Sequence, residues 1–227
     1  MKTLLLPVLL LSLLLCAHHP AAAERPAETR ASALPVDPAQ LPRSIFSGQQ
    51  GPFHVQGIAV DLENGYIYFS FTTELLKTDL QGKLIGSVVG MTGHLGCLTT
   101  NPADGRIYGS LEYKNDEIGK GILRSLNKSG AEADEHPSAF YVAIFDGNRI
   151  TRPGINAETD GVMSTVYLGE VVDDYYGTAT SGGREVKHRF GCSGIDGVSF
   201  GPAFGGKKDG KSYLNVAYGI YGDTTRT

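Results

Sequence analysis

The sequence has no tryptophan, only three cysteines and only a small excess of charge of one sign. Basic and acidic residues nearly balance, at 20 against 24, which excludes a broad basic surface for nucleic acid. The cysteines form no CxxC pair and have no zinc-like spacing with histidine, so the common structural zinc sites are excluded. No GxSxG, HExxH, P-loop or EF-hand sequence is present, and therefore no familiar motif assigns an activity.

Long apolar runs are confined to the N-terminus. Residues 1–23 combine a basic start, an apolar run and three small residues, which is the pattern of a cleaved signal peptide. No other segment approaches the roughly 20 apolar residues of a transmembrane helix. We therefore predict a secreted or periplasmic protein without a membrane span. Lipid attachment at Cys16 is the less favoured alternative, because Leu15 precedes it where a small residue is usual.

Residues 24–44 are rich in proline and show no hydrophobic periodicity, so they are predicted to form a disordered linker. The folded domain is expected to span residues 45–227. Two cysteines remain after cleavage, Cys97 and Cys192. An oxidising compartment permits a disulfide between them, and two buried thiols are the alternative.

Glycine is abundant, at 30 of 227 residues, and together with the 11 tyrosines it favours short strands and turns over a helix bundle. Residues 53–71 align without a gap on residues 93–111, at a shift of 40, and residues 194–219 give a third, weaker copy. Each copy predicts a short strand, a turn with Asn-Gly or Asp-Gly, and an alternating second strand. In the first copy a second hairpin at residues 75–88 completes a four-stranded unit, the size of a β-propeller blade.

The second copy carries an insertion at residues 113–137, where the pattern predicts a helix capped by Asn115 and ended by Gly130. Its outer hairpin is expected at residues 140–150, with a further strand at residues 163–171. The predicted fold class is therefore all-β, as about 2.5 blades of a six-bladed-type propeller. We expect the chain to be the N-terminal portion of a longer protein. A β-sandwich, and an arc that completes itself by oligomerising, are the alternatives.

Residues 57–68 and 101–108 resemble the NHL-repeat and gluconolactonase-like group of β-propellers. The resemblance covers roughly residues 53–110 and 194–218, at the level of single blades. It implies a propeller fold. It also implies one of the functions found in that group, which includes binding scaffolds, metal-dependent lactonases or esterases, and lyases. None of the catalytic signatures of that group can be matched residue by residue, so no active site is transferred.

In a propeller of this kind, the residues before each innermost strand and those after the second strand lie at one end. The candidate ligand-binding residues at this end are His54, His94, Glu112, Tyr113, Asp196 and Tyr218. Imidazole and carboxylate groups can hold a divalent cation or act as general acid and base. The candidate ligands of calcium or zinc are therefore His54, His94, Glu112 and Asp196.

Each candidate also has a structural interpretation. The histidines could satisfy a backbone carbonyl of the neighbouring blade, Asp196 could form an Asx turn, and Glu112 could be a solvated rim residue. The preferred function is a scaffold that binds an extracellular small molecule, glycan or peptide on its channel face. The alternative is a metal-dependent hydrolase or lyase of the lactonase kind.

Overall fold

The computed structural model describes residues 36–101, 103–126, 137–187, 194–204 and 210–219, which belong to one compact unit. Strands account for 48% of these residues, and two short helices accompany them, so the predicted all-β class is confirmed as a mostly β fold. The predicted signal peptide, Cys192 and the first part of the predicted linker lie outside the described residues.

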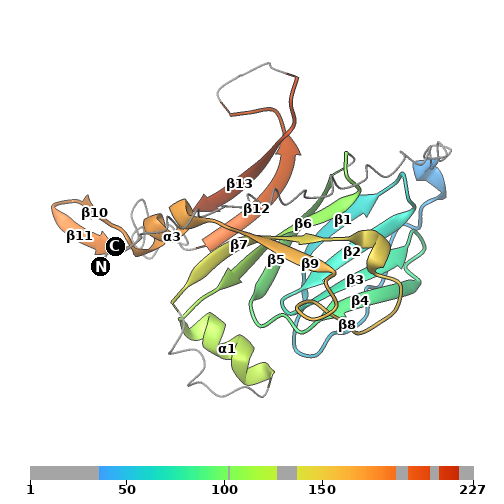
Figure 1. Ribbon diagram of the computed structural model, residues 1–227, viewed down its shortest axis with the longest axis horizontal. Coiled ribbons are helices and arrows are strands. Elements are labelled where there is room, and N and C mark those ends of the chain that lie inside the picture. Colours follow the sequence, from blue (N-terminus) through green and yellow to red (C-terminus); the bar gives the residue numbers. More distant parts are fainter. Residues whose placement is uncertain (1–35, 102, 127–136, 188–193, 205–209, 220–227) are drawn as a thin grey trace, which may run out of the picture. The chain divides into compact units, whose positions relative to one another are not determined.

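Sheet 1 contains the complete four-stranded unit that the first repeat predicts (Figure 1). Its antiparallel strands are β1 (Val55–Asp61), β2 (Tyr66–Phe71), β3 (Glu74–Asp79) and β4 (Leu84–Val89). A short fifth strand, β8 (Ile155–Asn156), adds to β4 in parallel. The sequence pattern did not predict this strand, because two residues show no periodicity.

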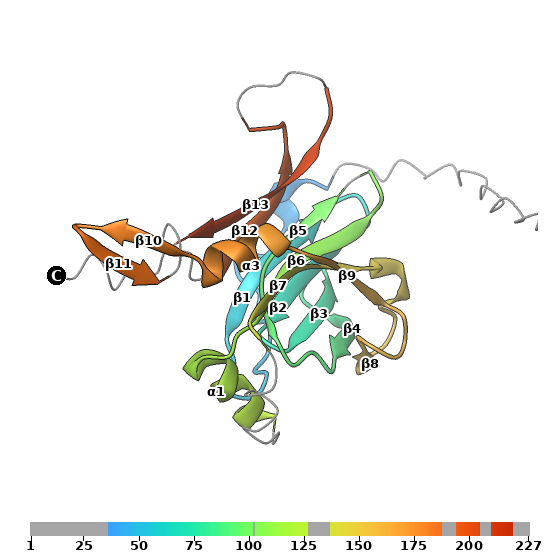
Figure 2. The ribbon, with the colours of Figure 1, turned by 60° about the vertical axis from the view of Figure 1, so that its left-hand side comes forward.

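Sheet 2 is built from the second repeat and has the order β5-β6-β7-β9. Its strands are β5 (His94–Asn101), β6 (Arg106–Tyr113), β7 (Ala139–Phe145) and β9 (Met163–Tyr167). Sheet 3 pairs β12 (Gly194–Gly201) with β13 (Tyr213–Gly219). A separate hairpin joins β10 (Thr178–Ser181) to β11 (Arg184–Lys187), as Figure 2 shows.

The 40-residue repeat is confirmed in the strand register. Asp61 pairs with Tyr66 at the turn of the first hairpin, and Asn101 pairs with Arg106 at the turn of the second. Gly65 and Gly105 close these turns with φ angles of 76° and 67°. Glycine adopts this left-handed conformation without the steric cost that other residues meet. The first strand of all three sheets also carries a register shift near its start, in β1, β5 and β12.

The predicted insertion contains helix α1 (Glu117–Ser125), but the predicted cap was wrong by one residue. The carboxylate of Asp116, rather than the side chain of Asn115, accepts the N–H groups of Ile118 and Gly119, both at 3.0 Å. The N–H of Asn115 donates instead to the hydroxyl of Ser138 at 3.0 Å, which fixes the chain before the helix. The predicted end at Gly130 lies outside the described residues.

In the outer part of sheet 2, one predicted strand is present but shorter than expected, and another prediction was wrong. The strand expected at residues 163–171 ends at Tyr167, and helix α3 (Gly169–Tyr176) follows, because its Val171 packs in a cluster with Phe140 and Ile195. The return strand expected at residues 149–150 is replaced by a 3₁₀ turn, η2 (Gly147–Arg149). The carboxylate of Asp146 caps this turn by accepting the N–H of Asn148.

The main core lies between sheets 1 and 2 and includes Tyr68, Leu75, Leu98 and Phe145. A second cluster covers the other face of sheet 1, where Val36, Leu41 and Ile45 pack on its phenylalanines. The packed domain therefore begins ahead of the predicted start at residue 45. Prolines interrupt regular structure here, apart from the short turn η1 (Pro38–Gln40), but the apolar side chains between them still bury sheet surface.

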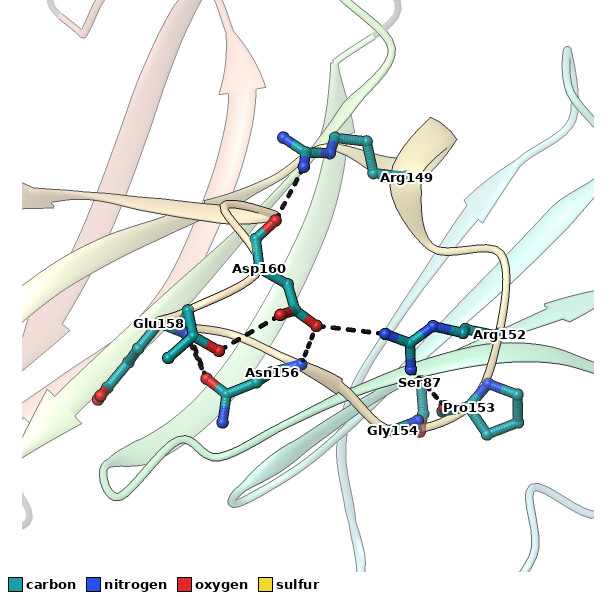
Figure 3. A network of polar contacts seen from close by, with 9 residues as sticks. Ser87, Arg149, Arg152, Pro153, Gly154, Asn156, Glu158 and Asp160 are labelled. Carbon is teal, nitrogen blue, oxygen red and sulfur yellow. Dashed lines mark hydrogen bonds and ion pairs between the residues drawn. The ribbon is translucent and has the colours of Figure 1, made fainter.

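The segment between β7 and β9 ties sheet 2 to the outer edge of sheet 1. The N–H of Ser87 donates to the carbonyl of Arg152 at 3.1 Å. The same segment is held in shape by Asp160, whose Oδ2 accepts the N–H of Asn156 at 3.0 Å and lies 3.4 Å from Arg152 (Figure 3). The guanidinium of Arg149 donates to the carbonyls of Gly161 and Asp160, both at 2.8 Å. This segment covers the edge strand β4. The backbone groups of Ser87 to Val89 are therefore engaged and do not offer an edge to another chain.

The first strands of the three sheets lie against one another, β1 against β5 and β5 against β12. Gly57 of β1 approaches so closely that a Cβ there would lie 2.6 Å from the carbonyl oxygen of Gly96. The hydroxyl of Ser70 donates to the same carbonyl at 2.5 Å, and the N–H of Leu95 donates to the carbonyl of Thr72 at 2.7 Å. Small residues and direct hydrogen bonds therefore join sheet 1 to sheet 2.

Candidate functional site

The structure brings together two of the predicted site residues, His94 and Glu112. They are direct backbone partners where β5 begins and β6 approaches its end. The Nδ1 atom of His94 lies 3.8 Å from Oε2 of Glu112, and the imidazole is part-exposed while the carboxylate is buried. The repeat predicted this proximity, because it placed both residues at the same end of adjacent strands.

Glu112 has protein partners on both of its carboxylate oxygens. Oε2 lies 3.3 Å from the ammonium of Lys114, which is buried as well, and Oε1 accepts the N–H of Ile195 in β12. A Cβ on Gly194 would collide with the same carboxylate, which explains the glycine at this position. The interpretation of Glu112 as a solvated rim residue was therefore wrong. Glu112 is buried, its charge is compensated by Lys114, and its contact with Ile195 joins sheet 2 to sheet 3.

Lys114 was missed by the sequence analysis, although a signal for it exists. It stands two residues after Glu112, and residues two apart in a strand point to the same face. If this alternation is extended past the end of the predicted strand, it places the side chains of Glu112 and Lys114 on the same face. The pair places no net charge beside His94, since the ammonium compensates the carboxylate.

His54 precedes β1 and is exposed. Its Nε2 lies 3.2 Å from the side-chain amide nitrogen of Gln56, which in turn donates to the hydroxyl of Thr72 at 3.4 Å. Thr72 also gives its carbonyl to the N–H of Leu95, one residue after His94. The polar groups of sheets 1 and 2 are thus linked by direct hydrogen bonds at this end. We call His54, Gln56, Thr72 and His94 the polar rim.

The other predicted site residues have different surroundings. The ring of Tyr113 packs edge-on to Tyr141, with centroids 5.8 Å apart, and burial raises the pKa of its hydroxyl. Tyr218 donates its hydroxyl to Asp174 at 3.0 Å, which connects β13 to helix α3. Asp196 lies at the register shift of β12, and its side chain lies outside what the structure describes. Tyr113 and Tyr218 therefore have packing and bridging contacts that the sequence could not show.

Among the side chains that the structure describes, no three His, Cys, Asp or Glu residues are grouped so that they could hold a metal ion. His94 and Glu112 are the predicted ligands that lie near each other, and the ammonium of Lys114 already stands at the carboxylate. A chelate at this position would need to displace Lys114 from the carboxylate. Cys97, in β5, carries a free thiol.

A second polar cluster lies at the opposite end of the strands and was also missed. The ammonium of buried Lys77 donates to the carbonyl of Gly147 at 2.9 Å and lies 3.8 Å from the centroid of the Tyr66 ring. Burial lowers the pKa of Lys77 and raises the pKa of the neighbouring Tyr68 hydroxyl. Because Lys77 is enclosed and bound to backbone of the β7–β9 segment, its role is to join sheets 1 and 2.

No protein-family model matches the chain, and no curated protein matches it either. The resemblance to the NHL-repeat and gluconolactonase-like propellers therefore stays a prediction. In the described part of the chain, neither helix has the length and apolar character needed to cross a membrane. The polar rim and its buried support are thus the features from which a function can be argued.

Proposed function

We propose that this chain is an exported binding scaffold of the β-propeller type, which recognises a polar extracellular molecule at the polar rim. The observation that carries the proposal is the position of His54 and His94. His54 precedes β1 and His94 begins β5, so both lie at the same end of two neighbouring strands, and both side chains are accessible. A radial arrangement is supported by the contacts of β1 with β5 and of β5 with β12. Propeller blades surround a central channel, so side chains at one end of the inner strands would lie around one mouth of it.

The chemistry of the polar rim favours a neutral, hydroxyl-rich or amide-rich ligand. The imidazoles of His54 and His94 and the amide of Gln56 offer hydrogen-bond donors or acceptors without a fixed charge, while buried Thr72 supports them from behind. The nearest charges, on Glu112 and Lys114, compensate each other at 3.3 Å and are buried. A glycan or a peptide backbone therefore fits this set better than a strongly anionic or cationic molecule does.

A metal-dependent hydrolase or lyase of the lactonase kind is the second candidate. The separation of 3.8 Å between His94 and Glu112 favours it, since these are common ligand types. The engagement of both Glu112 oxygens by Lys114 and Ile195 counts against it. The binding scaffold requires no such displacement, and for that reason it is the better supported of the two.

The test is a binding screen with the exported protein, followed by NMR of the labelled chain. A panel of neutral oligosaccharides and short peptides is the probe, with Zn²⁺ or Ca²⁺ alone as a separate arm. We expect shifts at His54 and His94 and at least tenfold weaker binding in His94→Ala. Arg106→Ala, an exposed change at the other end of β6, is the matched control and should bind normally.

Shifts elsewhere with an unperturbed polar rim would contradict the proposal. Saturable binding of either metal ion by the wild type, lost in His94→Ala while the fold is retained, would instead favour the hydrolase or lyase.

A further inference from the structure

Strand β9 forms the outer edge of sheet 2, and one of its two sides is open. The carbonyl of Val162 and the N–H of Leu168, which flank the strand, both bond to the β7 side, at 3.0 and 2.9 Å. Because the backbone groups alternate in direction along an antiparallel strand, those of Met163, Thr165 and Tyr167 point away from β7. In the part of the chain that the structure describes, these groups have no hydrogen-bond partner.

The character of β9 suits pairing with another strand. The corresponding edge of sheet 1 is covered by the chain itself, since β8 pairs with β4. Edge strands that stay unpaired usually carry charged side chains or proline, which oppose pairing with another chain. The strand Met163–Tyr167, MSTVY, carries neither, and its burial pattern leaves all side chains after the first one exposed. Val166 and Tyr167 are 50% and 56% exposed.

The sequence of β9 is complementary to itself in an antiparallel register centred on Thr165. In this register Thr165 lies opposite Thr165 of a second copy, and Met163 lies opposite the second copy's Tyr167. Opposite residues whose backbone groups face each other exchange both hydrogen bonds. This register therefore uses every open backbone group of β9, whereas a register displaced in either direction leaves some of them unpaired.

The side chains match in the same register, because opposite residues of a strand pair point to the same face. Met163 of one copy would meet the ring of Tyr167 of the other, which packs on Tyr141 with centroids 5.4 Å apart. A thioether sulfur and an aromatic ring attract each other. On the other face Val166 would lie opposite Ser164, so no like charges are opposed.

The charges that flank β9 match as well. Arg149 lies beside its start, where the guanidinium donates to the carbonyls of Asp160 and Gly161 (Figure 3). Arg149 forms no ion pair with any described residue. Glu170 and Asp173, both exposed in α3, follow the end of β9. In an antiparallel pair the end of one strand lies beside the start of the other, so these carboxylates would approach Arg149 of the second copy.

We propose that β9 pairs with β9 of a second copy of this chain, antiparallel and centred on Thr165, and so joins the two copies of sheet 2 into one continuous sheet. The same patch is used on both subunits, so the contact closes after two copies instead of growing into a fibre. The choice of partner rests on the self-complementary pattern of β9 and its flanks. The inference goes beyond the proposed function, since no residue of the polar rim takes part.

The experiment is sedimentation velocity of the protein across the micromolar range, where we expect a dimer for the wild type. Thr165→Pro should weaken association at least tenfold, because it removes an N–H on the open side of β9 while the bonds to β7 remain. Ile58→Lys is the matched control, since Ile58 is an exposed apolar residue of a strand in another sheet and its replacement should leave the dimer intact. Circular dichroism confirms that each variant is folded.

A charge exchange at Thr165 tests the register itself, and it needs no proline. Thr165→Lys and Thr165→Glu each place like charges opposite each other across the two-fold axis, so each should associate at least tenfold more weakly than the wild type. An equal mixture of the two variants should recover the dimer, because opposite charges then face each other.

A wild type that stays monomeric across this range overturns the inference, and so does a dimer that neither Thr165→Pro nor the two charged variants weaken. A mixture of the charged variants that associates no more tightly than either alone contradicts the register centred on Thr165. A monomer that still binds the oligosaccharide or peptide probes would overturn the strand pairing while leaving the proposed function in place.

Discussion

Replacing Gly57 by alanine tests the close approach of β1 and β5. The added Cβ would lie 2.6 Å from the carbonyl oxygen of Gly96 and 2.9 Å from the backbone nitrogen of Leu98. Both are backbone atoms and cannot rotate away, so the two strands would have to separate by roughly 1 Å to restore ordinary contact. The separation would also lengthen the hydrogen bond from Ser70 to Gly96, which is 2.5 Å.

The magnitude follows from these two effects. Overpacking costs about 1–3 kcal/mol, and a weakened hydrogen bond costs up to about 1 kcal/mol. The loss of glycine's flexibility in the unfolded chain offsets roughly 0.5–1 kcal/mol. We therefore expect Gly57→Ala to lower the free energy of unfolding by about 1–3 kcal/mol, and the Tm by roughly 2–12 °C for a domain of this size.

The assay is thermal and urea unfolding followed by circular dichroism. Gly121→Ala in helix α1 is the matched control, because its Cβ would meet only Arg124, at 3.8 Å. Alanine is the better helix former by about 0.8–1 kcal/mol, so this variant should be more stable than the wild type. A Gly57→Ala protein as stable as the wild type would refute the close approach of the two first strands.

Three further predictions concern single side chains, each measured by urea unfolding. Ser70→Ala should lower the free energy of unfolding by about 1 kcal/mol, because it removes the hydrogen bond to the carbonyl of Gly96. The hydroxyl of Ser110 is buried without a partner among the described residues, so Ser110→Ala should be neutral or stabilising. Equal losses of stability in the two variants would contradict this prediction. Asp116→Ala should destabilise by about 1 kcal/mol through loss of the cap of α1, while Asp116→Asn should retain most of the stability. Burial raises the pKa of Glu74, so the folded state favours the protonated form and this carboxyl's contribution to stability falls as pH rises above its ordinary value of 4.5. Glu74→Gln should therefore gain stability over the wild type at pH 7 and not at pH 4, and the same gain at both values would be inconsistent with the burial effect.

The hairpins could be predicted from the sequence because their signals are local. Asn64 and Gly65 specify a turn, and in the structure the carboxylate of Asp61 accepts the N–H and the side-chain amide of Asn64. The alternation after each turn then fixes which side chains face the core. These signals repeat at Asn101 and Gly105, so two hairpins with matching register were predictable.

The remaining features depend on contacts between distant segments. Helix α3 follows a strand directly, and Val171 finds its partners, Phe140 and Ile195, far away in the sequence. Strand β8 forms by pairing with the edge strand β4, and no local sequence pattern predicts that pairing. The same reason explains the candidate site, since the burial of Glu112 is completed by the backbone of Ile195, 83 residues away.

Nuclear Overhauser spectroscopy of the protein tests the central claim, that the repeated sheets lie side by side through their first strands. A Cβ on Gly57 would lie 2.9 Å from the Cα of Cys97, so a cross-peak between the α-protons of these two residues is expected. Cross-peaks between Ile58 and Phe69, which pair within sheet 1, show that β1 itself is formed. Cross-peaks within sheet 1 together with a cross-peak from Gly57 to Cys97 support the account. Intact peaks within the sheet but none to Cys97 would contradict it.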